Sequence, residues 1–129
     1  DQVSNIVKDR EGRIWIGTFG GGFCRFDEEK GIMEWLTAVE GLSDDNINSI
    51  IPGDDGKLWI STGNGISAYD PESRQFTNYM GRSEIPVNEF SMKGGIKLPG
   101  DRIYFSGSNG LVSFYPERLI ENRLYLRSY

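Results

Sequence analysis

Histidine is absent from this 129-residue sequence, and cysteine occurs once, at Cys24. The lack of histidine removes the side chain that proteins use most often as a general base and as a metal ligand. A single cysteine allows no disulfide within the chain and no cysteine-rich metal cluster. The sequence therefore predicts no catalytic residue, no metal site and no bound cofactor in this chain.

Long apolar runs and an excess of positive charge are also missing. No stretch approaches the roughly 18 apolar residues that a membrane-spanning helix needs, and no signal peptide opens the sequence. The formal net charge of −5 lacks the basic footprint that nucleic-acid binding requires. We expect no nucleic-acid partner and no direct membrane contact, and we expect any export or anchoring element to lie outside this sequence.

The sequence does contain a repeat. Residues 12–18, 56–62 and 101–107 are related, and their aromatic residues Trp15, Trp59 and Tyr104 are 44 and 45 positions apart. A fixed period of this length indicates one supersecondary unit used several times.

Each period contains short β-prone runs separated by glycine-rich or acidic turns. Asn-Gly at positions 64–65 predicts a tight hairpin because both residues tolerate positive φ, and residues 118–122 fit a single helical turn. We expect strands at 3–7, 14–16, 23–26, 32–36, 47–51, 58–60, 66–69, 75–79, 90–98, 103–105 and 111–114, with a further extended segment at 124–129.

Four short strands in about 44 residues are typical of one β-propeller blade. The predicted fold class is all-β, a partial β-propeller of about three four-stranded antiparallel blades. We place the blades at 1–45, 46–88 and 89–123, the last one atypical, with 124–129 starting a link to a missing domain. Because a closed ring needs about four to eight blades, we expect the remaining blades to come from a longer parent chain. We also expect the isolated fragment to self-associate through its open faces.

The repeat resembles the two-component regulator propeller repeat. Its departures from that pattern are Ser61 for a glycine, Tyr104 for the tryptophan and Gly107 for the threonine. The residues that carry the pattern in the first two copies are Gly12, Trp15, Gly17, Thr18, Gly22, Phe26, Asp27, Gly56, Trp59, Thr62, Gly65, Tyr69 and Asp70.

That family forms the extracytoplasmic sensor region of bacterial hybrid histidine kinases. The third copy, at residues 104–116, resembles the last blade before an immunoglobulin-like domain. The resemblance implies a periplasmic location, a carbohydrate or other small ligand, and a kinase in the parent chain.

Most of the repeat residues are expected to be structural. Trp15, Trp59 and Tyr104 lie in continuous apolar runs, which favours packing between blades over stacking on a sugar. Thr18 and Thr62 are expected to form hydrogen bonds within their own blades. The same structural role is assigned to the turn glycines Gly12, Gly56 and Gly110.

The candidate ligand surface is formed by the loops that precede the innermost strands, at residues 40–46 and 84–89. Asn46 and Asn88 are the candidate hydrogen-bonding residues in these loops, with strand capping as the alternative role. Phe19 is predicted at a hairpin tip, where an aromatic ring is available to a ligand.

The predicted function is a non-catalytic sensor fragment that helps to recognise an oligosaccharide and relays its binding to a membrane-linked histidine kinase. Two alternatives remain open. One is a propeller enzyme similar to streptogramin lyase, with its catalytic residues in missing blades. The other is a propeller lectin or scaffold without signalling.

Overall fold

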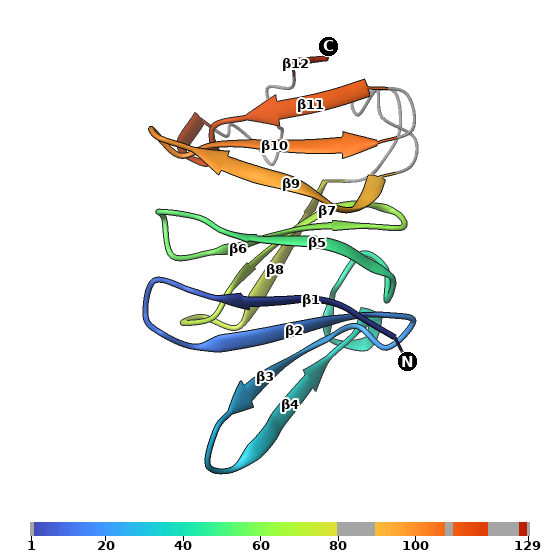
Figure 1. Ribbon diagram of the computed structural model, residues 1–129, viewed down its shortest axis with the longest axis vertical. Coiled ribbons are helices and arrows are strands. Elements are labelled where there is room, and N and C mark those ends of the chain that lie inside the picture. The colour runs from blue at the N-terminus through green and yellow to red at the C-terminus, as the bar shows by residue number, and fades with distance from the viewer. Residues whose placement is uncertain (1, 80–89, 108–109, 119–126, 129) are drawn as a thin grey trace.

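The computed structural model describes residues 2–79, 90–107, 110–118 and 127–128, and they form three four-stranded antiparallel sheets stacked along one axis (Figure 1). The prediction of three propeller blades is confirmed. The strands are β1 (Gln2–Lys8), β2 (Ile14–Phe19), β3 (Phe23–Asp27), β4 (Gly31–Leu36), β5 (Ile47–Pro52), β6 (Leu58–Thr62), β7 (Gly65–Asp70), β8 (Gln75–Tyr79), β9 (Phe90–Leu98), β10 (Arg102–Gly107), β11 (Gly110–Phe114) and β12 (Arg127–Ser128).

Each sheet is a meander in which consecutive strands pair. Two short 3-10 helices accompany the strands: η1 (Ala38–Glu40) between the first two blades and η2 (Pro116–Arg118) after β11. The sequence did not predict η1. Its helical turn is stabilised by a capping box, in which Thr37 and Glu40 exchange side chain–backbone hydrogen bonds. In the described part of the chain, no helix has the length and apolarity needed to cross a membrane.

The repeat tryptophans lie between the blades, as predicted. Trp15 is 2% exposed and packs with Phe23 of its own blade against Tyr69 of the second blade. Trp59 is fully buried and contacts Tyr79 and, in the third blade, Phe114. Each tryptophan therefore fills the gap between its own blade and the next one.

The first blade leaves its other face uncovered. Ile6 pairs with Ile16 in the first blade as Ile50 pairs with Ile60 in the second. Ile50 is 1% exposed because it packs against the first blade, whereas Ile6 is 68% exposed. The same repeat position is thus buried where a neighbouring blade is present and open where there is none. Self-association of the isolated chain through this face remains a prediction.

Strands β1, β5 and β9 are the innermost strands of the propeller. Each is the edge strand of its sheet, and β5 lies against both β1 and β9 (Figure 1). The strands that follow them in each blade extend outward from this axis. The inner strands begin at one end of the propeller, where residues 20–22 and 37–46 also lie; we call this the loop end. The turns at residues 9–13, 27–31, 53–57 and 70–74 lie at the opposite end, the turn end.

Two details add to the sequence-based expectation. In the hairpin after β6, only Gly65 has positive φ, at 88°, and Asn64 does not. Thr62 pairs directly with Gly65, so the reversal occurs at residues 63–64 and Gly65 takes the left-handed position after the turn. In the third blade, Arg127–Ser128 pairs with β11 as a fourth strand, although residues 124–129 were assigned to a link. The sequence predicts an extended segment at 124–129, but it does not show that part of this segment pairs within the third blade.

Candidate ligand site at the loop end

The repeat threonines shape the hairpins of the loop end. The Thr18 hydroxyl donates to the Gly22 carbonyl at 2.8 Å and accepts from the Gly21 backbone N–H at 3.1 Å. The Thr62 hydroxyl makes the equivalent bonds to the Gly65 carbonyl and the Asn64 N–H, both at 3.0 Å. Both threonines are almost fully buried. Their predicted role within the blade is therefore seen in the two copies.

Phe19 and Asn46 lie side by side, because an isolated antiparallel bridge joins them across the first two blades. Phe19 is the last residue of β2, next to the turn at residues 20–22, and is half-buried, so its availability to a ligand stays a prediction. Asn46 is exposed, and its N–H donates to the Asp44 carboxylate at 2.7 Å. Asn88 and the loop 84–89 lie outside the described residues.

The loop between the blades is held by hydrogen bonds on both sides. The Asp45 carbonyl accepts from the N–H groups of Gly20 and Gly22, and its carboxylate accepts from the Ala38 N–H at 2.7 Å. On the side of the second blade, the Ser67 hydroxyl donates to the Asn78 side-chain oxygen at 2.7 Å and accepts from the Ser43 N–H at 3.0 Å. The loop is therefore a built feature of the fold that fixes Asn46 at the loop end.

The inner strands are irregular close to this end. The pairing of β1 shifts between Val3 and Asn5, and that of β5 shifts between Ile47 and Ser49. The Asn5 amide nitrogen donates to the Asn48 carbonyl at 2.9 Å and so links the two bulges. Bulges free backbone polar groups from the ladder and are common near binding sites. Such groups are suited to hydrogen bonding with a polar ligand on the propeller axis.

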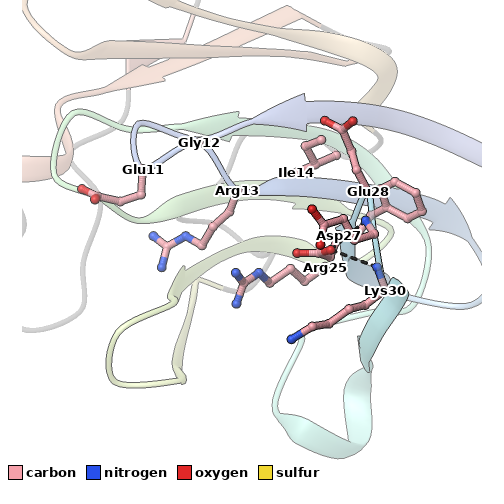
Figure 2. Close-up of a pocket in the computed structure, with 10 residues that line it drawn as sticks. Glu11, Gly12, Arg13, Ile14, Arg25, Asp27, Glu28 and Lys30 are labelled. Carbon is pink, nitrogen blue, oxygen red and sulfur yellow. Dashed lines mark hydrogen bonds between the residues drawn. The ribbon is translucent and has the colours of Figure 1, made fainter.

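The turn end carries a separate hollow of about 630 Å³ on the first blade (Figure 2). Arg13 and Arg25 point in the same general direction, while Glu28 points away from them (Figure 2). The Asp27 carboxylate stabilises the β3–β4 turn by accepting hydrogen bonds from the backbone N–H groups of Glu29 and Lys30. The complete lining consists of Glu11, Gly12, Arg13, Ile14, Arg25, Phe26, Asp27, Glu28, Glu29 and Lys30. This mixed-charge, shallow surface offers no preference for one class of ligand.

A buried carboxylate supports the first turn of the repeat. The Asp9 oxygens accept from the Trp15 indole N–H at 2.9 Å, the Arg13 Nε at 2.7 Å and the Glu11 N–H at 2.9 Å. Burial by itself raises the pKa of Asp9, but the hydrogen bonds from Trp15 and Arg13 and the charge of Arg13 outweigh it and hold the pKa below the ordinary value for aspartate. The ionised carboxylate is therefore part of the folded structure.

We expect Asp9→Asn to lower the unfolding free energy at pH 7 by about 1–2 kcal/mol, because it removes the charge-assisted bonds to Arg13 and Trp15. A depressed carboxyl pKa contributes stability above the unfolded pKa, and this contribution is lost as the pH falls through the folded pKa. The variant should therefore lose less stability than the natural chain between about pH 5 and pH 2 in urea titrations.

Asp101 supplies the matched control for this prediction. It is 5% exposed, and burial together with the charges of Asp54 and Asp55 raises its pKa, although the Asp54 N–H donates to it. Its φ of 64° suits asparagine. Asp101→Asn should therefore keep its stability at pH 7, and an equal loss in both variants would contradict the assigned roles.

The second copy of the turn lacks this carboxylate. Gly53 occupies the position of Asp9, as the matching backbone bonds to Lys57 and Arg13 show. The buried Trp59 indole N–H has no hydrogen-bond partner among the described residues, and a Cβ on Gly53 would lie 3.2 Å from its nitrogen. An acceptor at position 53 would thus be close to this unpaired donor.

We expect Gly53→Asn to be more stable than Gly53→Ala by about 1 kcal/mol, the net value of one buried hydrogen bond. Both variants add the same Cβ, which displaces the Asp55 carboxylate, so the comparison isolates the new bond. Thermal unfolding of the two variants measures the difference. Equal midpoints would show that the acceptor does not reach the indole.

None of these arrangements resembles a catalytic or metal centre. Among the described residues, no group of three or more histidine, cysteine, aspartate and glutamate side chains is placed to hold a metal ion. Cys24 is buried, and burial raises the pKa of its thiol, which disfavours the reactive thiolate. What the loop end offers chemically is hydrogen bonding to a polar ligand.

Comparison with known proteins identifies the repeat. The family model described as two-component regulator propeller matches residues 1–20 and 41–64, which contain the innermost and second strands of the first two blades. Histidine kinase P4 of Formosa agariphila is 26% identical over 82 residues, which is 64% of this chain and 6% of the kinase.

Two solved structures share the fold over 98% of this chain. One is the extracellular domain of a hybrid two-component system from B. thetaiotaomicron, with 24% identity and a TM-score of 0.77 over 16% of its length. The other is PorZ, a surface component of the type-IX secretion system of Porphyromonas gingivalis, with 20% identity and a TM-score of 0.68 over 19% of its length. This chain therefore spans less than a fifth of each. By its sequence pattern and its blades, the chain is similar to the propeller repeats of two-component regulators.

Proposed function

We propose that the chain is part of the periplasmic sensor region of a hybrid two-component histidine kinase and helps to recognise an oligosaccharide. The observation that carries this proposal is the family match in two consecutive blades, together with a fold shared with an extracellular domain of such a system. The chain itself is non-catalytic in this proposal. Binding would be relayed by a shift in the packing of the propeller against its neighbouring domains, because a ligand moves an equilibrium only through differential contacts.

The loop end is the proposed recognition surface. Asn46 is exposed and held in place by the Asp44 carboxylate and the bridge to Phe19. Fixed polar groups lose little conformational freedom on binding, which favours recognition of the many hydroxyl groups of a sugar. Asn88 is included in this surface on sequence grounds alone.

A panel of neutral and acidic oligosaccharides tests the proposal on the full-length protein. Calorimetry should reveal saturable binding of at least one oligosaccharide, and chromatography of the same mixtures should show it unchanged. Asn46→Ala should weaken that binding, while Glu28→Gln, an exposed position in the β3–β4 turn at the turn end, should leave it unchanged.

The two alternatives give different results in the same experiment. A streptogramin-lyase-like enzyme would convert its substrate during the titration. A lectin or scaffold would bind without altering kinase activity, and the likeness to PorZ, a surface component of a secretion system, favours the scaffold over the enzyme. If none of the oligosaccharides in the panel binds, the proposal that this region recognises a carbohydrate is overturned.

A further inference from the structure

A second hollow, of about 340 Å³, lies on the propeller axis between the inner strands of the first and third blades. It is lined by Lys93 of β9 and by four consecutive residues of β1, namely Val3, Ser4, Asn5 and Ile6. Both strands are edge strands of their sheets, so their outer edges carry backbone groups that pair with no neighbouring strand. A space of this size accommodates one sugar ring and its substituents.

Lys93 is the distinctive residue of this hollow. Its φ of 59° is a left-handed conformation that lysine rarely adopts, and strained positions of this kind gather at binding sites. Lys93 is exposed and has neither a hydrogen bond nor an ion pair among the described residues. Lys97 of the same strand, by contrast, is paired with Asp54 at the turn end.

The wall opposite Lys93 contains no carboxylate and includes one buried hydroxyl without a hydrogen-bond partner among the described residues. Ser4 lies at the bulge of β1, is 1% exposed, and its hydroxyl has no hydrogen-bond partner among the described residues. The Asn5 side chain is occupied in the contact between blades, where it bonds the Asn48 carbonyl and the Ile50 N–H. The positive charge of Lys93 is therefore not neutralised by the lining of its own hollow.

We propose that this hollow binds the carboxylate or sulfate group of an acidic saccharide and that Lys93 is the charge partner of that group. The proposal rests on the carbohydrate-sensing function proposed above and specifies the class of its ligand. A charge-assisted bond to lysine is stronger than a neutral one, and the chain is otherwise acidic, with a net charge of −5. An acidic sugar would thus be attracted at this position on the axis and disfavoured over the rest of the surface.

Three sugars that differ only at carbon 6 test the proposal: galacturonate, galactose 6-sulfate and galactose. We expect the full-length protein to bind at least one acidic sugar about tenfold or more tightly than galactose, as measured by calorimetry in low salt. Lys93→Gln should remove this preference and leave galactose binding within about twofold. Lys93→Arg should retain it, and Lys8→Gln, at the exposed far end of β1, should behave as the natural protein.

Each outcome bears on the proposal. A preference for galacturonate alone identifies a carboxylate site, and one for galactose 6-sulfate alone identifies a sulfate site. Equal binding of the three sugars, absence of binding by both acidic sugars, or a preference that persists in Lys93→Gln would overturn the inference. Binding of neutral oligosaccharides in the panel described above would then leave the sensor function standing while the acidic-ligand proposal fails.

Discussion

Replacing Trp59 with alanine is expected to lower the unfolding free energy by about 3–5 kcal/mol, the range found when a large buried aromatic side chain is truncated. Trp59 is fully buried between the second and third blades, with ring centroids 5.0 Å from Phe114 and 6.0 Å from Tyr79. Among the described residues, the indole N–H has no hydrogen-bond partner, so the loss comes from packing and from the remaining cavity. Chemical unfolding followed by far-ultraviolet circular dichroism measures it.

Trp35 provides the matched control, because it lies on the uncovered face of the first blade and is 44% exposed. Trp35→Ala should cost less than about 1 kcal/mol in this chain, as for most exposed substitutions. If Trp59→Ala proves too unstable to purify, Trp59→Phe should still fold and retain part of the interface. Equal losses at positions 59 and 35 would contradict the assignment of Trp59 to the contact between blades.

Substituting Gly22 with alanine should be the most damaging change among the turn glycines. Gly22 has a φ of 75°, and a Cβ there would lie 2.2 Å from the backbone oxygen of Leu36. Such an overlap with backbone cannot be relieved by rotating a side chain, so the hairpin must shift. The Gly22 N–H also donates to the Asp45 carbonyl, which ties the loop to the first blade. We expect a loss of about 3 kcal/mol or more from strain and overpacking together.

Gly12→Ala isolates the conformational part of that cost. Gly12 has a similar φ of 85°, but a Cβ there meets no atom within 4 Å. Its cost should therefore be only the left-handed backbone penalty, about 1–2 kcal/mol. The difference between the two variants should also appear in hydrogen exchange: the backbone amides of residues 20 and 22 should exchange faster only in Gly22→Ala. Equal losses in the two variants would show that the contact with Leu36 is readily relieved.

The repeat made much of the fold predictable. A large aromatic residue that recurs after 44 and 45 residues in an apolar run must be buried by something outside its own sheet, and stacked blades are the simple solution. The strand positions followed from the turns between them. The second threonine of the motif, Thr62, could be assigned a structural role because its neighbour Gly65 marks the hairpin.

Other features depend on tertiary contacts that one sequence does not reveal. Phe19 reads as a hairpin residue, yet its bridge to Asn46 is formed only when the first two blades meet. The unusual backbone of Lys93 results from the irregular pairing of β9 with β10, and lysine carries no signal for such a conformation. The hydrogen bond from Trp15 to Asp9 could in principle be predicted from the sequence. An aspartate lies six positions before the tryptophan in the first copy, and the second copy has a glycine, Gly53, at the matching position.

Ligand-dependent phosphoryl transfer tests the central claim most directly. The full-length protein, reconstituted in membranes, would be supplied with labelled ATP and titrated with the saccharide that binds it best. The account predicts that phosphorylation changes with a midpoint equal to the binding midpoint and that Asn46→Ala shifts both together. Saturated binding with no change in phosphorylation would contradict the sensor function and favour a lectin or scaffold.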